Sequence, residues 1–102
     1  MTRLGSSPRR AVFGVVFLLS VSGCSTLPVQ EVSDARQAID SARLAGGDRY
    51  TPETLNEAER LVARALRDLS DGDYESARSA AASAKQQAIL AREASLSAQA
   101  SR

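Results

Sequence analysis

The sequence lacks the residue types on which many active sites depend. Its 102 residues include no histidine, no tryptophan and a single cysteine. Without histidine a Ser-His-Asp triad cannot form, and one cysteine provides neither an intramolecular disulfide nor a cluster of thiolate ligands. Only two aromatic residues, Tyr50 and Tyr74, follow the first 23 residues. The composition therefore predicts a protein that is not an enzyme and that holds no metal ion or other cofactor.

Net charge is also small. The formal charge is +1, but three arginines and no acidic residue lie within residues 1–23, which leaves ten basic and twelve acidic side chains in the rest of the chain. Binding of nucleic acid by its backbone phosphates requires a basic protein surface. We therefore expect no nucleic acid partner.

The N-terminus has the pattern of a secretory signal peptide. Arg3, Arg9 and Arg10 precede an apolar run over residues 11–19. This run is far shorter than the roughly 20 residues that a membrane-spanning helix needs. We therefore expect residues 1–23 to be removed on export.

The residues after this run resemble the lipobox of bacterial lipoproteins. Val21 and Gly23 occupy the −3 and −1 positions of the cleavage site, and Cys24 follows directly. The resemblance implies diacylglycerol transfer to the Cys24 thiol, cleavage after Gly23 and acylation of the new amine. Residues 24–30 would form a lipidated tether. Ser25 stands where aspartate would signal retention, so analogy with enterobacterial sorting favours the outer membrane, facing the periplasm. An ordinary secreted protein and a transmembrane anchor are the alternatives, and Pro28 with its polar neighbours disfavours the second.

Residues 31–102 predict one alanine-rich, all-α domain. Helices are expected over residues 29–45, 52–69 and 74–98, because apolar residues recur every three or four positions between glycine-containing breaks. Thr51 and Asp73 are the expected N-caps of the second and third helices. The segments form either an antiparallel hairpin with a loose first helix or a three-helix bundle. The expected buried positions are Val32, Ala35, Ile39, Ala42, Leu55, Ala58, Val62, Ala65, Leu69, Ala77, Ala81, Ala84, Ala88, Ala91, Ser95 and Ala98.

The third expected helix buries mainly alanine. Alanine lets helices approach closely but contributes little buried area, so a domain of this size is marginally stable alone. The helix also exceeds the second by about two turns. We therefore expect its C-terminal end to project beyond the bundle and expose Ile89 and Leu96, or to pair with another copy.

Two short motifs are better explained as structure than as sites. The acidic turn 71–73 resembles the start of a calcium loop, but Ala82 stands where an EF-hand loop needs glutamate. We expect a turn and a helix cap there. Residues 72–77 resemble the turn and second helix of a tetratricopeptide unit, yet a solenoid needs about three repeats. A tetratricopeptide-like hairpin is the simpler expectation, with Tyr50 and Tyr74 as packing residues.

Two groups of basic residues define a candidate interaction face. One group lies on the outer face of the second helix, and the other recurs every seven residues along the third. Such a face would suit anionic lipid or peptidoglycan, whereas the acidic residues between them are typical of a solvated helix face. The residues are Arg60, Arg64, Arg67, Arg78, Lys85 and Arg92.

Three segments share a pattern with one known family. They are Ala38-Ile39-x-x-Ala42, then Ala45-Gly46-x-Asp48-x-Tyr50-x-Pro52-Glu53-x-Leu55 with Ala58, and Asp71-Gly72-Asp73-Tyr74-x-x-Ala77 with the alanine-spaced helix to Ala94. In these segments the chain resembles the domain of unknown function 4398 family of short, helical Gram-negative envelope lipoproteins. The resemblance implies a helical fold and an envelope location, and it brings no known activity.

The preferred functional hypothesis is a non-catalytic, lipid-anchored helical module for structural or adaptor interactions in the periplasm. Its partners would be the membrane, through Cys24, and an envelope protein or a second copy. The alternative is a module that binds peptidoglycan or anionic lipid through the basic residues. A hydrolase or other enzyme would need an active site built with a partner chain. No small-molecule substrate is expected.

Overall fold

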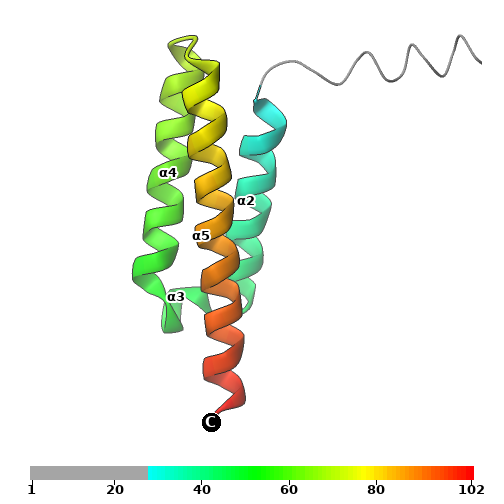
Figure 1. Ribbon diagram of the computed structural model, residues 1–102. Coiled ribbons are helices and arrows are strands. Elements are labelled where there is room, and N and C mark those ends of the chain that lie inside the picture. The colour runs from blue at the N-terminus through cyan, green and yellow to red at the C-terminus, as the bar shows by residue number, and fades with distance from the viewer. Residues whose placement is uncertain (1–27) are drawn as a thin grey trace, which may run out of the picture.

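The computed structural model describes residues 28–102. These residues form α2 (Val29–Leu44), α3 (Gly47–Tyr50), α4 (Pro52–Ser70) and α5 (Tyr74–Ala100). Figure 1 shows the three long helices side by side, with α5 between α2 and α4 and with the single-turn α3 at one end. The all-α prediction is confirmed, and the arrangement is the three-helix bundle, because α2 packs along both α5 and α4.

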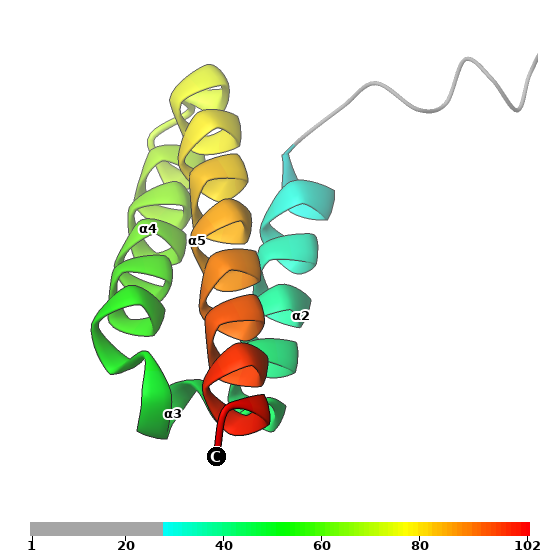
Figure 2. The ribbon, with the colours of Figure 1, turned by 60° about the horizontal axis from the view of Figure 1, so that its bottom comes forward.

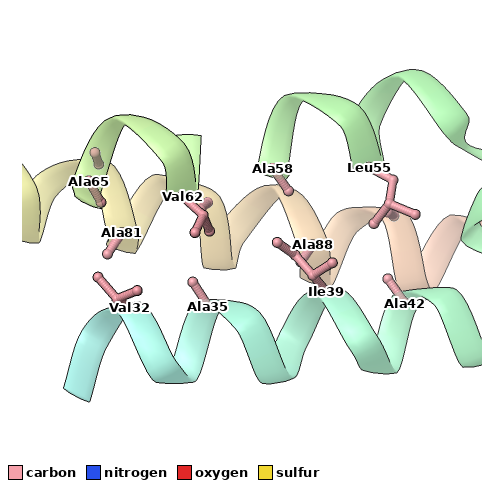
Figure 3. Close-up of a cluster of buried hydrophobic side chains, with 13 residues drawn as sticks. Val32, Ala35, Ile39, Ala42, Leu55, Ala58, Val62, Ala65, Ala81 and Ala88 are labelled. Carbon is pink, nitrogen blue, oxygen red and sulfur yellow. The ribbon is translucent and has the colours of Figure 1, made fainter. Parts of the chain in front are cut away.

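The core is asymmetric in side-chain size. α5 packs closely along both neighbours and presents buried alanines to them. The larger buried side chains, Val32, Ile39, Leu55 and Val62, come from α2 and α4 and lie between those helices (Figure 3). An alanine side chain is a single methyl, so α5 approaches both partners closely, whereas valine, isoleucine and leucine keep α2 and α4 further apart.

Most predicted core positions are buried. Leu69 and Ala98 are the exceptions, since each is half-buried at the margin of its helix. Ala80 is buried although it was not predicted, because it lies three residues after Ala77 and faces the core beside it. The predicted stripe of the first helix is buried in full.

Two adjacent glycines form a corner where a simple helix stop was predicted. Gly46 adopts a left-handed backbone with φ of 96°, and its N–H donates to the Arg43 carbonyl oxygen at 2.9 Å. α3, which the sequence did not predict, starts at the next residue. A Cβ on Gly47 would stand 2.9 Å from the carbonyl oxygen of Ala42, and one on Gly46 would stand 3.0 Å from the Tyr50 ring. The corner therefore needs glycine at both positions.

Both predicted N-cap residues occupy that position, and one of them makes a capping hydrogen bond. The Asp73 carboxylate accepts a hydrogen bond from the backbone N–H of Ser76 at 3.3 Å, as expected. Thr51 precedes Pro52 at the first position of α4, but its side chain makes no capping bond. Thr51 is thus the N-cap residue of α4 as predicted, but its hydroxyl bonds to α5 instead of capping the helix.

The C-terminal end of α5 extends past the start of α4, as predicted, but it contacts the corner there instead of projecting without contacts (Figure 1). Ser95 is fully buried, and the Gln99 side chain donates to the Ala45 carbonyl oxygen. Arg102 donates to the Tyr50 hydroxyl at 2.7 Å. Figure 2 shows α3, which the sequence did not predict, beside this end of α5. Of the two residues expected to be exposed on α5, only Leu96 is exposed.

Two further expectations about side chains near the helix ends need correction. Ile89 was expected to be exposed and is half-buried. Tyr74 was expected to pack and is 44% exposed, because it begins α5 beyond the last turn of α4. Only Tyr50 is half-buried, at the corner.

The corner predicts unequal effects of two glycine substitutions. Gly46→Ala and Gly72→Ala both place a side chain at positive φ, which carries a penalty of about 1–2 kcal/mol. Gly46→Ala should lower the free energy of unfolding further, because its Cβ meets Tyr50, whereas the space around Gly72 is open. Urea unfolding measures both. Equal destabilisation would show that the corner tolerates a Cβ.

The alanine seam predicts that added volume on α5 separates the helices. Ala84 is fully buried and Ala82 is exposed on the same helix. Ala84→Leu should reduce the free energy of unfolding by about 1–3 kcal/mol, and Ala82→Leu should change it by less than about 0.5 kcal/mol. Thermal unfolding followed by circular dichroism measures both. Similar midpoints for the two variants would contradict close packing at the seam.

Candidate functional site

The predicted lipidation residue, Cys24, and the predicted signal peptide lie outside the described residues. Pro28 is buried and α2 starts at Val29, so Val29 and Gln30 of the predicted tether already belong to the helix. None of the helices in residues 28–102 is long and apolar enough to cross a membrane.

The two groups of basic residues lie on opposite sides of α5. Ser76 on α5 donates to the Asp68 carboxylate of α4 at 2.7 Å, whereas Arg78 pairs with Glu31 of α2 at 3.6 Å. Residues two apart on a helix point about 200° apart. Arg78, Lys85 and Arg92 therefore follow the α2 side of α5, away from the group on α4. The structure does not bring the six residues onto one surface.

Half of these six residues form ion pairs. Arg60 holds Glu57 through two hydrogen bonds of 3.0 and 2.5 Å, and Arg64 lies 3.6 Å from Asp68. The hydrogen bond from Arg60 lowers the pKa of the Glu57 carboxyl, and the same bond raises the pKa of the Arg60 guanidinium. Arg78 is the third. Within residues 28–102, Arg67, Lys85 and Arg92 form no ion pair.

A groove between α2 and α4 is the concave feature that sequence reasoning missed. Arg36 borders two adjoining hollows along it. The middle of the groove carries Arg43, which pairs with Glu59 across it. The end near the start of α2 is apolar, with Leu66 on the α4 side. We call this feature the α2–α4 groove; it is lined by Val29, Val32, Ser33, Arg36, Ile39, Asp40, Arg43, Glu59, Val62, Leu66 and Leu69.

The groove follows from the seam described above. α5 packs along both partners through alanine, whereas α2 and α4 pack less extensively on each other, with the longer side chains of the core between them. Figure 3 shows these side chains in front of α5. The sequence contained one signal for the groove, since Leu66 is an apolar residue beside the predicted stripe of its helix.

A polar contact fixes the opposite end of the bundle. The Thr51 hydroxyl lies 3.2 Å from the Ser95 hydroxyl and 3.3 Å from the Ala91 carbonyl oxygen. A hydroxyl carries one hydrogen, so when Thr51 donates to Ala91, Ser95 donates to Thr51. Every buried side-chain nitrogen and oxygen in the described part of the chain has a hydrogen-bond partner. The hydroxyls of Thr51 and Ser95 therefore stabilise the contact between α5 and the segment before α4.

The acidic turn is a structural feature of the helix junction. Asp68 and Asp73 both accept hydrogen bonds from Ser76, and Gly72 between them has φ of 81°. Across residues 28–102, no three histidine, cysteine, aspartate or glutamate side chains gather to hold a metal ion. The predicted turn and cap at residues 71–73 are confirmed.

These observations define a small all-α domain with a groove on one face, which is apolar toward the start of α2, and with a polar corner at the opposite end. The family model described as a domain of unknown function (DUF4398) matches residues 30–102, and the chain belongs to this family. The match confirms the family predicted from the sequence. No curated protein and no solved structure matches the chain. The function must therefore be argued from the residues.

The Thr51–Ser95 contact predicts energetic coupling. Thr51→Val and Ser95→Ala should each reduce stability, and a double-mutant cycle should give a coupling of about 0.5–1.5 kcal/mol. The matched control pairs Thr51→Val with Ser83→Ala, an exposed serine on the same helix. Chemical unfolding of the single and double variants measures both couplings. Additive effects of Thr51→Val and Ser95→Ala would exclude a direct bond.

Proposed function

We propose that this protein is a non-catalytic cell-envelope lipoprotein, in which a lipid anchor at Cys24 holds a helical module for structural or adaptor interactions in the periplasm. The proposal rests mainly on the order of residues in the N-terminal segment. Three arginines, a short apolar run, two small residues and the sole cysteine follow one another in the order that lipoprotein processing requires. Two or three acyl chains anchor a protein far more firmly than one.

The position of α2 is compatible with such an anchor. Four peptide units separate Cys24 from Pro28, so the two Cα atoms lie within about 14 Å of each other at full extension. The bundle would therefore stand close to the bilayer, held by a short linker. A short linker restricts the orientations that an anchored module samples.

The non-catalytic part of the proposal is supported by how the hydroxyls and carboxylates are used. Thr51 and Ser95 bond to each other, and Asp68 and Asp73 bond to Ser76. No histidine is present anywhere in the sequence to act as a base. The interaction role is supported by the α2–α4 groove, whose apolar end is open to a partner.

The anchor predicts two separable effects of substitution next to the cleavage site. Cys24→Ala should abolish incorporation of labelled fatty acid and release the protein from the membrane fraction, because no thiol remains to accept the diacylglycerol. Ser25→Asp should leave acylation unchanged and move the protein from the outer to the inner membrane. Metabolic labelling followed by sucrose-gradient separation of the two membranes measures both.

Circular dichroism provides the control for these variants. Both substitutions precede α2, so the helix content of each variant should equal that of the parent protein. Fatty-acid incorporation into Cys24→Ala at the parent level would contradict the anchor. An unchanged membrane distribution of Ser25→Asp, with acylation intact, would contradict outer-membrane sorting by residue 25.

A further inference from the structure

The described part of the chain begins at one end of the bundle, only four residues after Cys24 in the sequence. Figure 1 shows that the start of α2 and the turn between α4 and α5 occupy the same end, and that the chain terminus at Arg102 occupies the opposite end. Pro28, which directly precedes α2, lies at the first of these ends, and Cys24 is four residues before it in the sequence. If Cys24 is acylated, as proposed above, this end faces the bilayer. We refer to it as the anchor end.

The α2–α4 groove opens at the anchor end with exposed aliphatic side chains. Val29, in the first turn of α2, is 54% exposed, and Leu66, in the last turns of α4, is 38% exposed. Both line the same hollow, together with Leu69. Exposed aliphatic groups on adjoining helices create an apolar surface that water solvates poorly.

Two arginines beside this surface have no ion partner. Arg36 borders the hollow, and Arg67 follows Leu66 in sequence, about 100° further round α4 on its outer face. Both side chains are exposed, and neither forms an ion pair within residues 28–102. Among the acidic residues at the same end, Glu31 pairs with Arg78 and Asp68 with Arg64, whereas Asp71, Asp73 and Glu75 are exposed around the turn. Arg36 therefore places an unpaired positive charge directly beside the aliphatic groups of the groove, on the side away from this acidic turn.

We propose that this surface, formed by Val29, Leu66, Arg36 and Arg67, rests on the anionic headgroup region of the bilayer to which Cys24 is anchored. The inference rests on the proposed lipid anchor and adds to it a second contact that fixes the orientation of the bundle. Aliphatic groups enter the boundary between headgroups and acyl chains, and arginine side chains extend to the phosphates. Each basic residue near an anionic surface strengthens such binding.

The proposal differs from binding through the predicted basic stripes. Lys85 and Arg92 lie along α5 on its α2 side, remote in sequence from the turn that marks the anchor end. The most exposed large apolar residue among residues 28–102, Leu44 at 91%, ends α2 at the corner and is remote from the anchor. These residues provide matched controls.

Tryptophan fluorescence tests the contact, because the chain contains no tryptophan of its own. Leu66→Trp and the control Leu44→Trp are made in the full chain, processed in bacteria and reconstituted into vesicles of phosphatidylcholine and phosphatidylglycerol with brominated acyl chains. The emission of Leu66→Trp should be blue-shifted and quenched by bromine. That of Leu44→Trp should remain unquenched. Val29→Trp gives an independent reading if Leu66→Trp disturbs the helix content.

The charge requirement is tested in the Leu66→Trp background. Arg36→Glu with Arg67→Glu should shift the equilibrium away from lipid contact by about tenfold or more, and quenching should fall accordingly. Lys85→Glu with Arg92→Glu should leave quenching unchanged. Loss of quenching in the second pair alone would overturn the assignment of the surface and favour the stripe on α5.

The mass of each sample shows whether Cys24 is acylated. It therefore distinguishes a failure of the proposed anchor from a failure of the proposed orientation. An unmodified Cys24 in protein recovered from membranes would contradict the proposed anchor. An acylated protein in which neither Leu66→Trp nor Val29→Trp is quenched would overturn the orientation alone. A blue shift that depends on protein concentration and not on brominated lipid would also overturn it, and would indicate that a second copy covers the surface.

Discussion

The close approach of α5 to both of its neighbours is the contact on which the rest of the bundle depends. It is made by alanine side chains, each fully or almost fully buried, such as Ala81, Ala84 and Ala88. A helix that presents methyl groups to two partners becomes the central element and brings its partners near without filling the space between them. Val32, Ile39 and Val62 bridge that space, and the groove beside them is the consequence.

The two ends of the bundle have different chemistry for the same reason. At the corner, α5 continues past the start of α4, and its polar groups bond to the backbone and hydroxyls of the connecting segment through Ser95 and Gln99. At the anchor end the helices are joined by a tight turn, so the first residues of α2 and the last turn of α4 remain open. A fixed corner and an open anchor end suit a module that is held at one end and oriented there.

Much of this fold is predictable from residue spacing. The three long helices, the buried stripe of α2 and the Asp73 cap follow from local rules that the structure obeys. α3 and the role of Thr51 do not, because both depend on contacts with residues more than 40 positions away, such as Ser95. The groove is indicated in the sequence only by Leu66, which is too little to predict it. Periodicity shows which residues face inward, but not that α2 and α4 meet less closely than either meets α5.

The orientation of the bundle follows from where the chain is anchored, so the state of Cys24 is the most important property to measure. The most direct measurement is the intact mass, with N-terminal fragmentation, of the protein extracted from bacterial membranes. We expect an N-terminus at Cys24 that carries a diacylglycerol group on sulfur and a further acyl chain on the amine. A different N-terminus, or a Cys24 with a free thiol, would contradict the proposed anchor.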